Sequence, residues 1–377
     1  MSRVLRFLVA LALMATGFGA PVSAGTRSLA AGVVAPVPRG ATEAVAVATP
    51  TIAQLVGQKL VVRMDGVTPS ADLLGRIRRG EVGGVILFGP NITTALALIV
   101  LTRQLHAAAA SGRQPHFLIG VDQEGGSIKR LPWAPPTLSP LGMGRIGLTS
   151  VARWQGASTG AALRRLGIDL DFAPVADVPA TTSSFLYRAG RTFSFSATRT
   201  AALSEAFAAG LESAGVVPSM KHFPGIGFAT RNTDSTVVTI SATRAGLAAG
   251  LLPYQSAIQQ HMPLIMLSNA VYPAYDRIHA AGWSAAIGGT LLRTQLGFSG
   301  ATITDSLDGI AQARAVTTRS LAVQAARAGT DMILTTGSEA STRQVYATLV
   351  REATQGLIPL VTLQGSYTRI IALKAGL

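Results

Sequence analysis

The chain has 377 residues, of which 48% are hydrophobic and only 13% are charged. A disordered chain would be polar and rich in charge, so this composition excludes a largely disordered protein. Cysteine is absent, which excludes disulfides, thiolate catalysis and cysteine-bound zinc. The formal net charge of +14 comes mostly from arginine, since lysine occurs only at Lys59, Lys129, Lys221 and Lys374. Such a charge is compatible with nucleic acid, an anionic envelope or solubility alone.

Residues 1–24 have the three parts of a secretory signal peptide. Arg3 and Arg6 form a basic start, an apolar run extends from Phe7 to Ala15, and small residues lead to Ala24. We therefore predict cleavage after Ala24 and a secreted, extracytoplasmic protein, with an uncleaved anchor as the alternative. Residues 25–50 are rich in Ala, Pro and Gly without a period, which predicts a linker.

From residue 51 onwards, short apolar segments alternate with Ala- and Leu-rich segments of helical spacing. Eight segments suit strands buried on both faces: 59–65, 82–89, 116–122, 169–177, 216–222, 264–270, 301–306 and 331–336. The helical segments include 94–110, 148–166, 197–213, 243–260, 311–328 and 339–355. This alternation predicts one α/β domain over 51–377, a TIM (β/α)8 barrel. A doubly wound open sheet is the rival, but its glycine-rich turn after the first strand is missing.

Polar residues gather at the C-terminal ends of these strands, where a barrel places its functional groups. They are Asp122, Asp177, Lys221, His222, Asn269 and Asp305. The strong basic charge suggests association with anionic wall polymers. Nucleic acid is not the predicted partner, because no Lys/Arg cluster with interleaved aromatic residues is present.

Three strings at these ends carry possible chemistry. In GVDQEGG, Asp122 could accept hydrogen bonds from sugar hydroxyls or simply cap a loop. In KHFPGIG, the Lys221-His222 pair suits recognition of hydroxyls or of a carboxylate, or forms a solvated rim pair. In TDSL, Asp305 could be a nucleophile in glycosyl transfer, or the N-cap of a helix starting near Gly309.

These strings resemble the N-terminal catalytic domain of glycoside hydrolase family 3. DFAPVADV at 171–178, TDS at 233–235 and LLRTQLGFSGATITDSLDG at 291–309 extend the similarity over roughly residues 50–375. The chain is similar in particular to the single-domain bacterial β-N-acetylglucosaminidases, or β-N-acetylhexosaminidases, that trim peptidoglycan fragments.

The resemblance implies a retaining β-glycosidase with Asp305 as its nucleophile. Asp122, Arg130, Lys221 and His222 would bind the sugar, and Arg191 in AGRTF would join them. It also implies an N-acetylglucosamine-containing saccharide as substrate, with no metal and no organic cofactor. We further expect a monomer.

The sequence departs from that family branch in the loop from Gly225 to Thr236. The resemblance places a general acid/base histidine at position 236, but this chain has Thr236, whose hydroxyl does not titrate near neutral pH. Ile226 and Asn269 replace two further histidines. Asp234 is retained, either as a substitute acid or as the remnant of an Asp–His pair.

Glu124 and Asp308 are more remote candidates for the acid, with a loop cap and a surface charge as the simpler interpretations. Two other functions remain open. One is a catalytically impaired protein that binds saccharide or a protein partner. The other is a phosphorolytic or transglycosylating variant.

Overall fold

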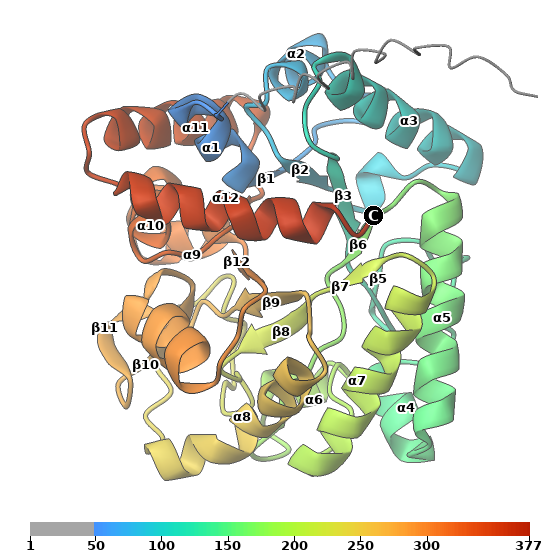
Figure 1. The fold of residues 1–377 in the computed structure, drawn as a ribbon. Coiled ribbons are helices and arrows are strands. Elements are labelled where there is room, and N and C mark those ends of the chain that lie inside the picture. Colours follow the sequence, from blue (N-terminus) through green and yellow to red (C-terminus); the bar gives the residue numbers. More distant parts are fainter. Residues whose placement is uncertain (1–48) are drawn as a thin grey trace, which may run out of the picture. The chain divides into compact units, whose positions relative to one another are not determined.

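The structure, a computed structural model, describes residues 49–377 (Figure 1). The predicted signal peptide and the predicted linker up to residue 48 lie outside the described residues. Within 49–377, no helix has both the length and the apolar character needed to cross a bilayer.

All eight predicted strands are present. The parallel strands are β1 (Leu60–Arg63), β2 (Gly84–Ile86), β3 (Leu118–Val121), β6 (Leu170–Asp171), β7 (Val217–Pro218), β8 (Met220–Phe223), β9 (Leu264–Leu267), β12 (Ala301–Thr304) and β13 (Ile333–Thr335). Only Ser219 separates β7 from β8, and together these two short strands correspond to the one strand predicted over 216–222. Two antiparallel hairpins were not predicted: β4 (Gln123–Gly125) with β5 (Ile128–Lys129), and β10 (Val271–Tyr272) with β11 (Asp276–Ala280).

The parallel strands follow the order of a TIM barrel. One six-stranded sheet has the order β13-β1-β2-β3-β6-β7, and a three-stranded sheet has the order β12-β9-β8. An isolated parallel bridge joins Ile303 of β12 to Met332 beside β13. The parallel strands thus form two hydrogen-bonded sheets. Strands that are consecutive along the chain still lie side by side, as in a TIM-barrel-like α/β fold.

The helices surround these strands (Figure 1). They are α1 (Ile52–Lys59), α2 (Ala71–Arg78), α3 (Ala95–Ser111), α4 (Pro140–Ile146), α5 (Thr149–Arg165), α6 (Phe185–Arg188), α7 (Ala197–Ser213), α8 (Arg244–Gln259), α9 (Leu307–Ala313), α10 (Thr318–Arg327), α11 (Glu339–Thr354) and α12 (Leu360–Lys374). The remaining helical elements are two short 3-10 helices, η1 (Gly89–Asn91) and η2 (Ala281–Trp283), and the π-helix η3 (Ala285–Gln295).

The single helix predicted over 311–328 was wrong. Ala315 has a positive φ of 54°, which ends α9, and the Thr317 side chain accepts a hydrogen bond from the Ser320 amide at the start of α10. A residue in the left-handed region cannot continue a right-handed helix. The helices α1, α2, α4, α6, α12 and η3 lie outside the helical segments named from the sequence.

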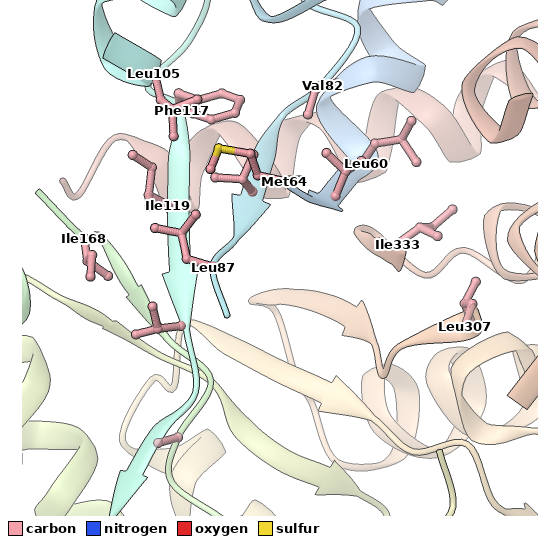
Figure 2. Packing of buried hydrophobic residues seen from close by; sticks show 14 of the residues in the cluster. Leu60, Met64, Val82, Leu87, Leu105, Phe117, Ile119, Ile168, Leu307 and Ile333 are labelled. Atoms are coloured by element: carbon pink, nitrogen blue, oxygen red, sulfur yellow. The ribbon is translucent and has the colours of Figure 1, made fainter. Parts of the chain in front are cut away.

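Side chains alternate between the two faces of each strand and so divide the apolar core. Leu60 and Val62 of β1 join an outer cluster between strands and helices, while Val61 joins a cluster inside the barrel. Figure 2 shows part of the outer cluster, including Leu60, Ile119 and Ile333.

Helix α12 covers the N-terminal end of the barrel. Its Ile370 and Leu373 belong to the inner cluster, and Lys374 Nζ donates to Gln58 Oε1 and to the Gly83 carbonyl at 2.6 and 2.8 Å. Because α12 closes the N-terminal end of the barrel, a binding site is expected at the opposite end, where the C-terminal ends of the strands lie.

Candidate active site

A cavity of about 140 Å³ lies at the C-terminal ends of the strands. Its polar lining contains the residues predicted to react with or bind the sugar: Asp122, Arg130, Arg191, Lys221, His222, Asp234 and Asp305. Apolar and small residues complete it: Ile86, Phe88, Ile128, Met266, Ser306, Leu334 and Thr336. The barrel therefore brings together residues that lie far apart in the sequence.

Asp122 is held by two cations. Lys221 Nζ donates to its Oδ1 at 2.8 Å, and Arg130 Nη2 donates to its Oδ2 at 3.0 Å. Burial disfavours the ionised form, but Lys221 and Arg130 outweigh that cost and hold the Asp122 pKa well below its usual range. An ionised carboxylate keeps further lone pairs on both oxygens, and these can accept hydrogen bonds from hydroxyl groups in the cavity. Asp122 is not a simple loop cap.

Glu124 shares Lys221 with Asp122, and its side chain is fully buried. Arg191 forms a two-pronged ion pair with it, from Nε to Oε2 at 2.8 Å and from Nη2 to Oε1 at 2.7 Å. Lys221 Nζ is also 2.7 Å from Glu124 Oε1. Burial opposes ionisation of Glu124, yet Arg191 and Lys221 lower its pKa. Both oxygens are engaged, so Glu124 orients the two cations and is not a free acid.

His222 is oriented by Asp177, a buried aspartate at the end of the predicted strand 169–177. Asp177 Oδ2 lies 2.7 Å from His222 Nδ1, and Asp177 Oδ1 accepts the Ile226 amide at 2.6 Å. Because an ionised carboxylate only accepts hydrogen bonds, Nδ1 carries the proton. Nε2 is then directed to the cavity, 4.0 Å from Asp305 Oδ2.

Asp305 follows β12 directly and faces the cavity. Its Oδ1 accepts a hydrogen bond from the Ser306 amide at 2.8 Å. Helix α9 begins at Leu307 with Ser306 as its N-cap. The alternative role of Asp305 as the N-cap is therefore wrong, and its Oδ2 remains on the cavity side near His222.

Asp234 reaches the cavity from the loop that follows β8. Burial first, and then the negative charge of Asp305, raises the pKa of Asp234 to about 7. Within the described residues, its Oδ1 is buried without a hydrogen-bond partner. A Cβ at Gly309 of α9 would lie 2.3 Å from the Asp234 carbonyl oxygen. Glycine at 309 thus allows the loop to approach α9 closely and carry the carboxyl into the site.

The three positions that lack histidine differ in their surroundings. Ile226 is buried in an apolar cluster with Phe223 and Leu247. Asn269 is buried, and its Nδ2 donates to the Ser306 carbonyl at 2.9 Å. Thr236 is half-buried, two residues beyond Asp234. Ile226 and Asn269 therefore have structural roles of their own.

Asp308 does not line the cavity. Its Oδ1 accepts a hydrogen bond from the Thr318 hydroxyl at 3.0 Å, and its Oδ2 accepts one from the Thr336 amide. It connects α9 to α10 and to the end of β13, and so it is neither a free surface charge nor a candidate acid.

A family model described as "Glycosyl hydrolase family 3 N terminal domain" matches residues 51–373. The chain belongs to glycoside hydrolase family 3. It is 32% identical over 345 residues to an "Uncharacterized secreted glycosyl hydrolase" of Arthroderma benhamiae, covering 88% of this chain and 97% of the relative. It is 33% identical over 286 residues to the "Beta-hexosaminidase" of Bordetella parapertussis, covering 73% of this chain and 78% of the relative.

The fold agrees with solved structures of family 3. A family 3 β-N-acetylglucosaminidase from Paenibacillus sp. matches with a TM-score of 0.82 at 28% identity. The match covers 87% of this chain and 63% of that longer chain. The resemblance found in the motifs is thus confirmed over the whole barrel, and this family 3 protein is a glycoside hydrolase of the β-hexosaminidase-like kind.

Sequence reasoning missed Phe88 and Thr336 of the lining. Both lie at the C-terminal end of a predicted strand, 82–89 and 331–336, so the rule that selected Asp122 and Asp305 could have selected them too. Arg130 Cζ lies 5.2 Å from the centre of the Phe88 ring. This contact helps to orient the guanidinium toward Asp122.

Proposed function

We propose that this family 3 protein is a secreted, retaining β-N-acetylhexosaminidase in which Asp305 is the nucleophile and Asp234 replaces the missing histidine as general acid/base. One observation carries the proposal. The Asp234 carboxyl lies in the cavity beside Asp305, with a pKa raised to about 7 by burial and by that neighbour. A carboxyl that holds a proton near neutral pH can donate it to a leaving group.

The chemistry proceeds in two steps. Asp305 Oδ2 attacks the anomeric carbon and forms a glycosyl-enzyme ester, while Asp234 gives its proton to the departing glycosidic oxygen. Water then attacks the same carbon, Asp234 takes a proton from that water, and the bond to Asp305 breaks. The sugar leaves with its original anomeric configuration, and Asp234 is again protonated.

The charged residues around Asp122 and Glu124 would bind the sugar in this scheme. Asp122 would accept hydrogen bonds from two hydroxyls, while Arg130, Lys221 and Arg191 would donate to sugar oxygens. His222 Nε2 would accept a hydroxyl close to Asp305. Interactions of this kind that strengthen in the transition state lower the barrier, whereas equal binding of both states does not.

The substrate we propose is an N-acetylglucosamine-containing saccharide of the cell wall or a related polymer. The name of the Bordetella relative supports the sugar, and that of the Arthroderma relative supports secretion. The formal charge of +14 supports residence on an anionic wall. We propose a monomer that needs no metal or organic cofactor for hydrolysis.

The first experiment compares turnover of two β-N-acetylglucosaminides by the purified protein. One carries an activated aryl leaving group, which departs without protonation, so its release tests Asp305 without the need for an acid. The other carries a sugar leaving group, which also needs an acid. Cleavage of both supports the proposal.

Cleavage of the aryl compound alone would retain Asp305 but reject Asp234 as a working acid. Cleavage of neither would favour the alternative of an impaired saccharide-binding protein, since Thr236 stands where the acid/base is expected. Turnover that depends on inorganic phosphate would instead identify a phosphorolytic variant.

A further inference from the structure

Two histidines and a buried aspartate meet at the N-terminal end of the barrel, away from the catalytic cavity. His106 lies on α3, His116 precedes β3, and Asp169 precedes β6. His116 Nε2 is 3.0 Å from Asp169 Oδ1, and His106 Nε2 is 3.4 Å from Asp169 Oδ2. The two imidazole rings have centroids 5.0 Å apart at an interplanar angle of 44°. Three separate segments thus bring two imidazole nitrogens to the two oxygens of one carboxylate.

We propose that His106, His116 and Asp169 form a binding site for a divalent transition-metal ion of the Zn²⁺ type. One donor atom from each residue lies within 4.8 Å of the other two. Ligands bonded to Zn²⁺ at about 2.0–2.2 Å in a tetrahedral arrangement are separated by roughly 3.3–3.5 Å. The two histidine–aspartate separations are close to that spacing, so small side-chain movements suffice. Two imidazoles and one carboxylate are a ligand set that Zn²⁺ accepts.

The surroundings favour a held carboxylate and accessible imidazoles. The Asp169 side chain is only 1% exposed, and its Oδ2 accepts the Ile119 amide at 3.1 Å. The side chains of His106 and His116 are 27% and 33% exposed. An ion could enter from solvent and keep water in its fourth position, while the backbone contact fixes the carboxylate.

Two existing contacts compete with the ion. Arg164 Nη1 lies 3.1 Å from Asp169 Oδ1, and His106 Nε2 lies 3.1 Å from the Gly167 carbonyl. The Arg164 side chain is 43% exposed, so it can move into solvent when the ion binds. The bound ion would join α3 to the segments that lead into β3 and β6. The role we infer is structural, since the catalytic residues lie at the other end of these strands.

The test uses the purified protein without a polyhistidine tag, with Zn²⁺ measured by titration calorimetry and Co²⁺ by visible absorption. We expect one equivalent of Zn²⁺ and a Co²⁺ spectrum typical of nitrogen and oxygen ligands. Saturating Zn²⁺ should raise the unfolding temperature by about 3–5 °C. His116→Ala should weaken Zn²⁺ binding by at least about 100-fold, more than loss of an outer-shell partner costs.

The matched control is His279→Ala. His279 Nδ1 also pairs with an aspartate, Asp276, at 3.1 Å, but within residues 49–377 no second histidine is grouped with it. This variant should bind Zn²⁺ as the unaltered protein does. If His116→Ala does not fold, His106→Ala takes its place with the same expectation.

Arg164→Met separates metal binding from a merely structural cluster. Removing the competing guanidinium should tighten Zn²⁺ binding about tenfold or more, whereas a cluster held together by ion pairs would only lose stability. The proposal is overturned if Zn²⁺ binds equally well to the protein and to His116→Ala and His106→Ala. It is also overturned if the bound equivalent disappears in Asp305→Asn, because the ion would then occupy the catalytic cavity.

Discussion

Nε2 of His222 lies 4.0 Å from Oδ2 of Asp305. The imidazole cannot turn away freely, because Asp177 holds its Nδ1 at 2.7 Å. The buried aspartate therefore fixes the ring orientation beside the proposed nucleophile. The contact between Asp177 and His222 therefore holds the cavity in its geometry in the absence of sugar.

Asp305→Asn removes the proposed nucleophile with almost no change in shape. We expect turnover of an aryl β-N-acetylglucosaminide to fall by at least about 10⁴-fold, as happens when a covalent nucleophile is lost. Steady-state kinetics and circular dichroism measure the loss and the fold. Asp276→Asn, outside the cavity, is the control and should retain activity. Comparable rates for Asp305→Asn and the unaltered protein would remove Asp305 from this role.

Asp234→Asn tests the proposed acid through the leaving group. Turnover of the substrate with a sugar leaving group should fall by about 10²–10⁴-fold, which is the usual contribution of general acid/base catalysis. Glycosylation by an activated aryl substrate needs no acid, so the burst of aryl product should persist in rapid-mixing kinetics. If Asp234→Asn lowered the burst of aryl product as much as the turnover of the sugar-leaving substrate, Asp234 would not be the general acid.

The raised pKa of Asp234 predicts that activity and stability both decline as pH rises. As an acid, Asp234 must be protonated, so cleavage of the sugar-leaving substrate should decline as pH rises through about 7. The folded state holds this proton more tightly than the unfolded state, whose carboxyl titrates near its ordinary value. Its contribution to stability is therefore complete at low pH and is lost as pH rises from about 4 to about 7.

Asp234→Asn should accordingly raise the unfolding temperature more at pH 8 than at pH 4. Thermal unfolding at both pH values measures this difference. A variant whose unfolding temperature changes equally at the two pH values would show that the Asp234 pKa is not raised in the fold.

Glu124→Gln removes the charge that orients Arg191 and Lys221. Loss of one partner in a buried ion network leaves uncompensated charge, so we expect the free energy of unfolding to fall by about 3 kcal/mol. KM should rise by about tenfold or more, because the displaced cations are the ones we propose to bind the sugar. Glu352→Gln is the control. Its partners Arg327 and Arg351 are surface arginines, and its loss should cost less than about 1 kcal/mol.

Thr236→His places an imidazole two residues beyond Asp234. We expect turnover of the sugar-leaving substrate to rise by about tenfold to 10²-fold, less than the full effect of an acid because Asp234 already supplies a proton. Thr239→His, at an exposed position of the same segment, should change nothing. An unchanged rate in Thr236→His would show that the loop differs from its relatives in more than this side chain.

Predictions from local pattern succeeded where burial decides the structure. Strands of a parallel sheet are apolar on both faces, so β1, β3, β9 and β12 are visible as short apolar runs. The same reasoning failed between residues 311 and 328, where helical composition continues through Ala315. The positive φ of Ala315 depends on how α9 and α10 pack, which periodicity does not record.

The sequence by itself determined the strand order, the catalytic candidates and the family, since these depend on residue types and their spacing along the chain. Only the tertiary structure decided what the charges do. Lys221 meets Asp122 across 99 residues of chain, and Arg191 meets Glu124 across 67. The pKa of Asp234 likewise depends on burial and on Asp305, from another strand end. Electrostatic interactions follow distance in space and local dielectric, neither of which is written in the order of residues.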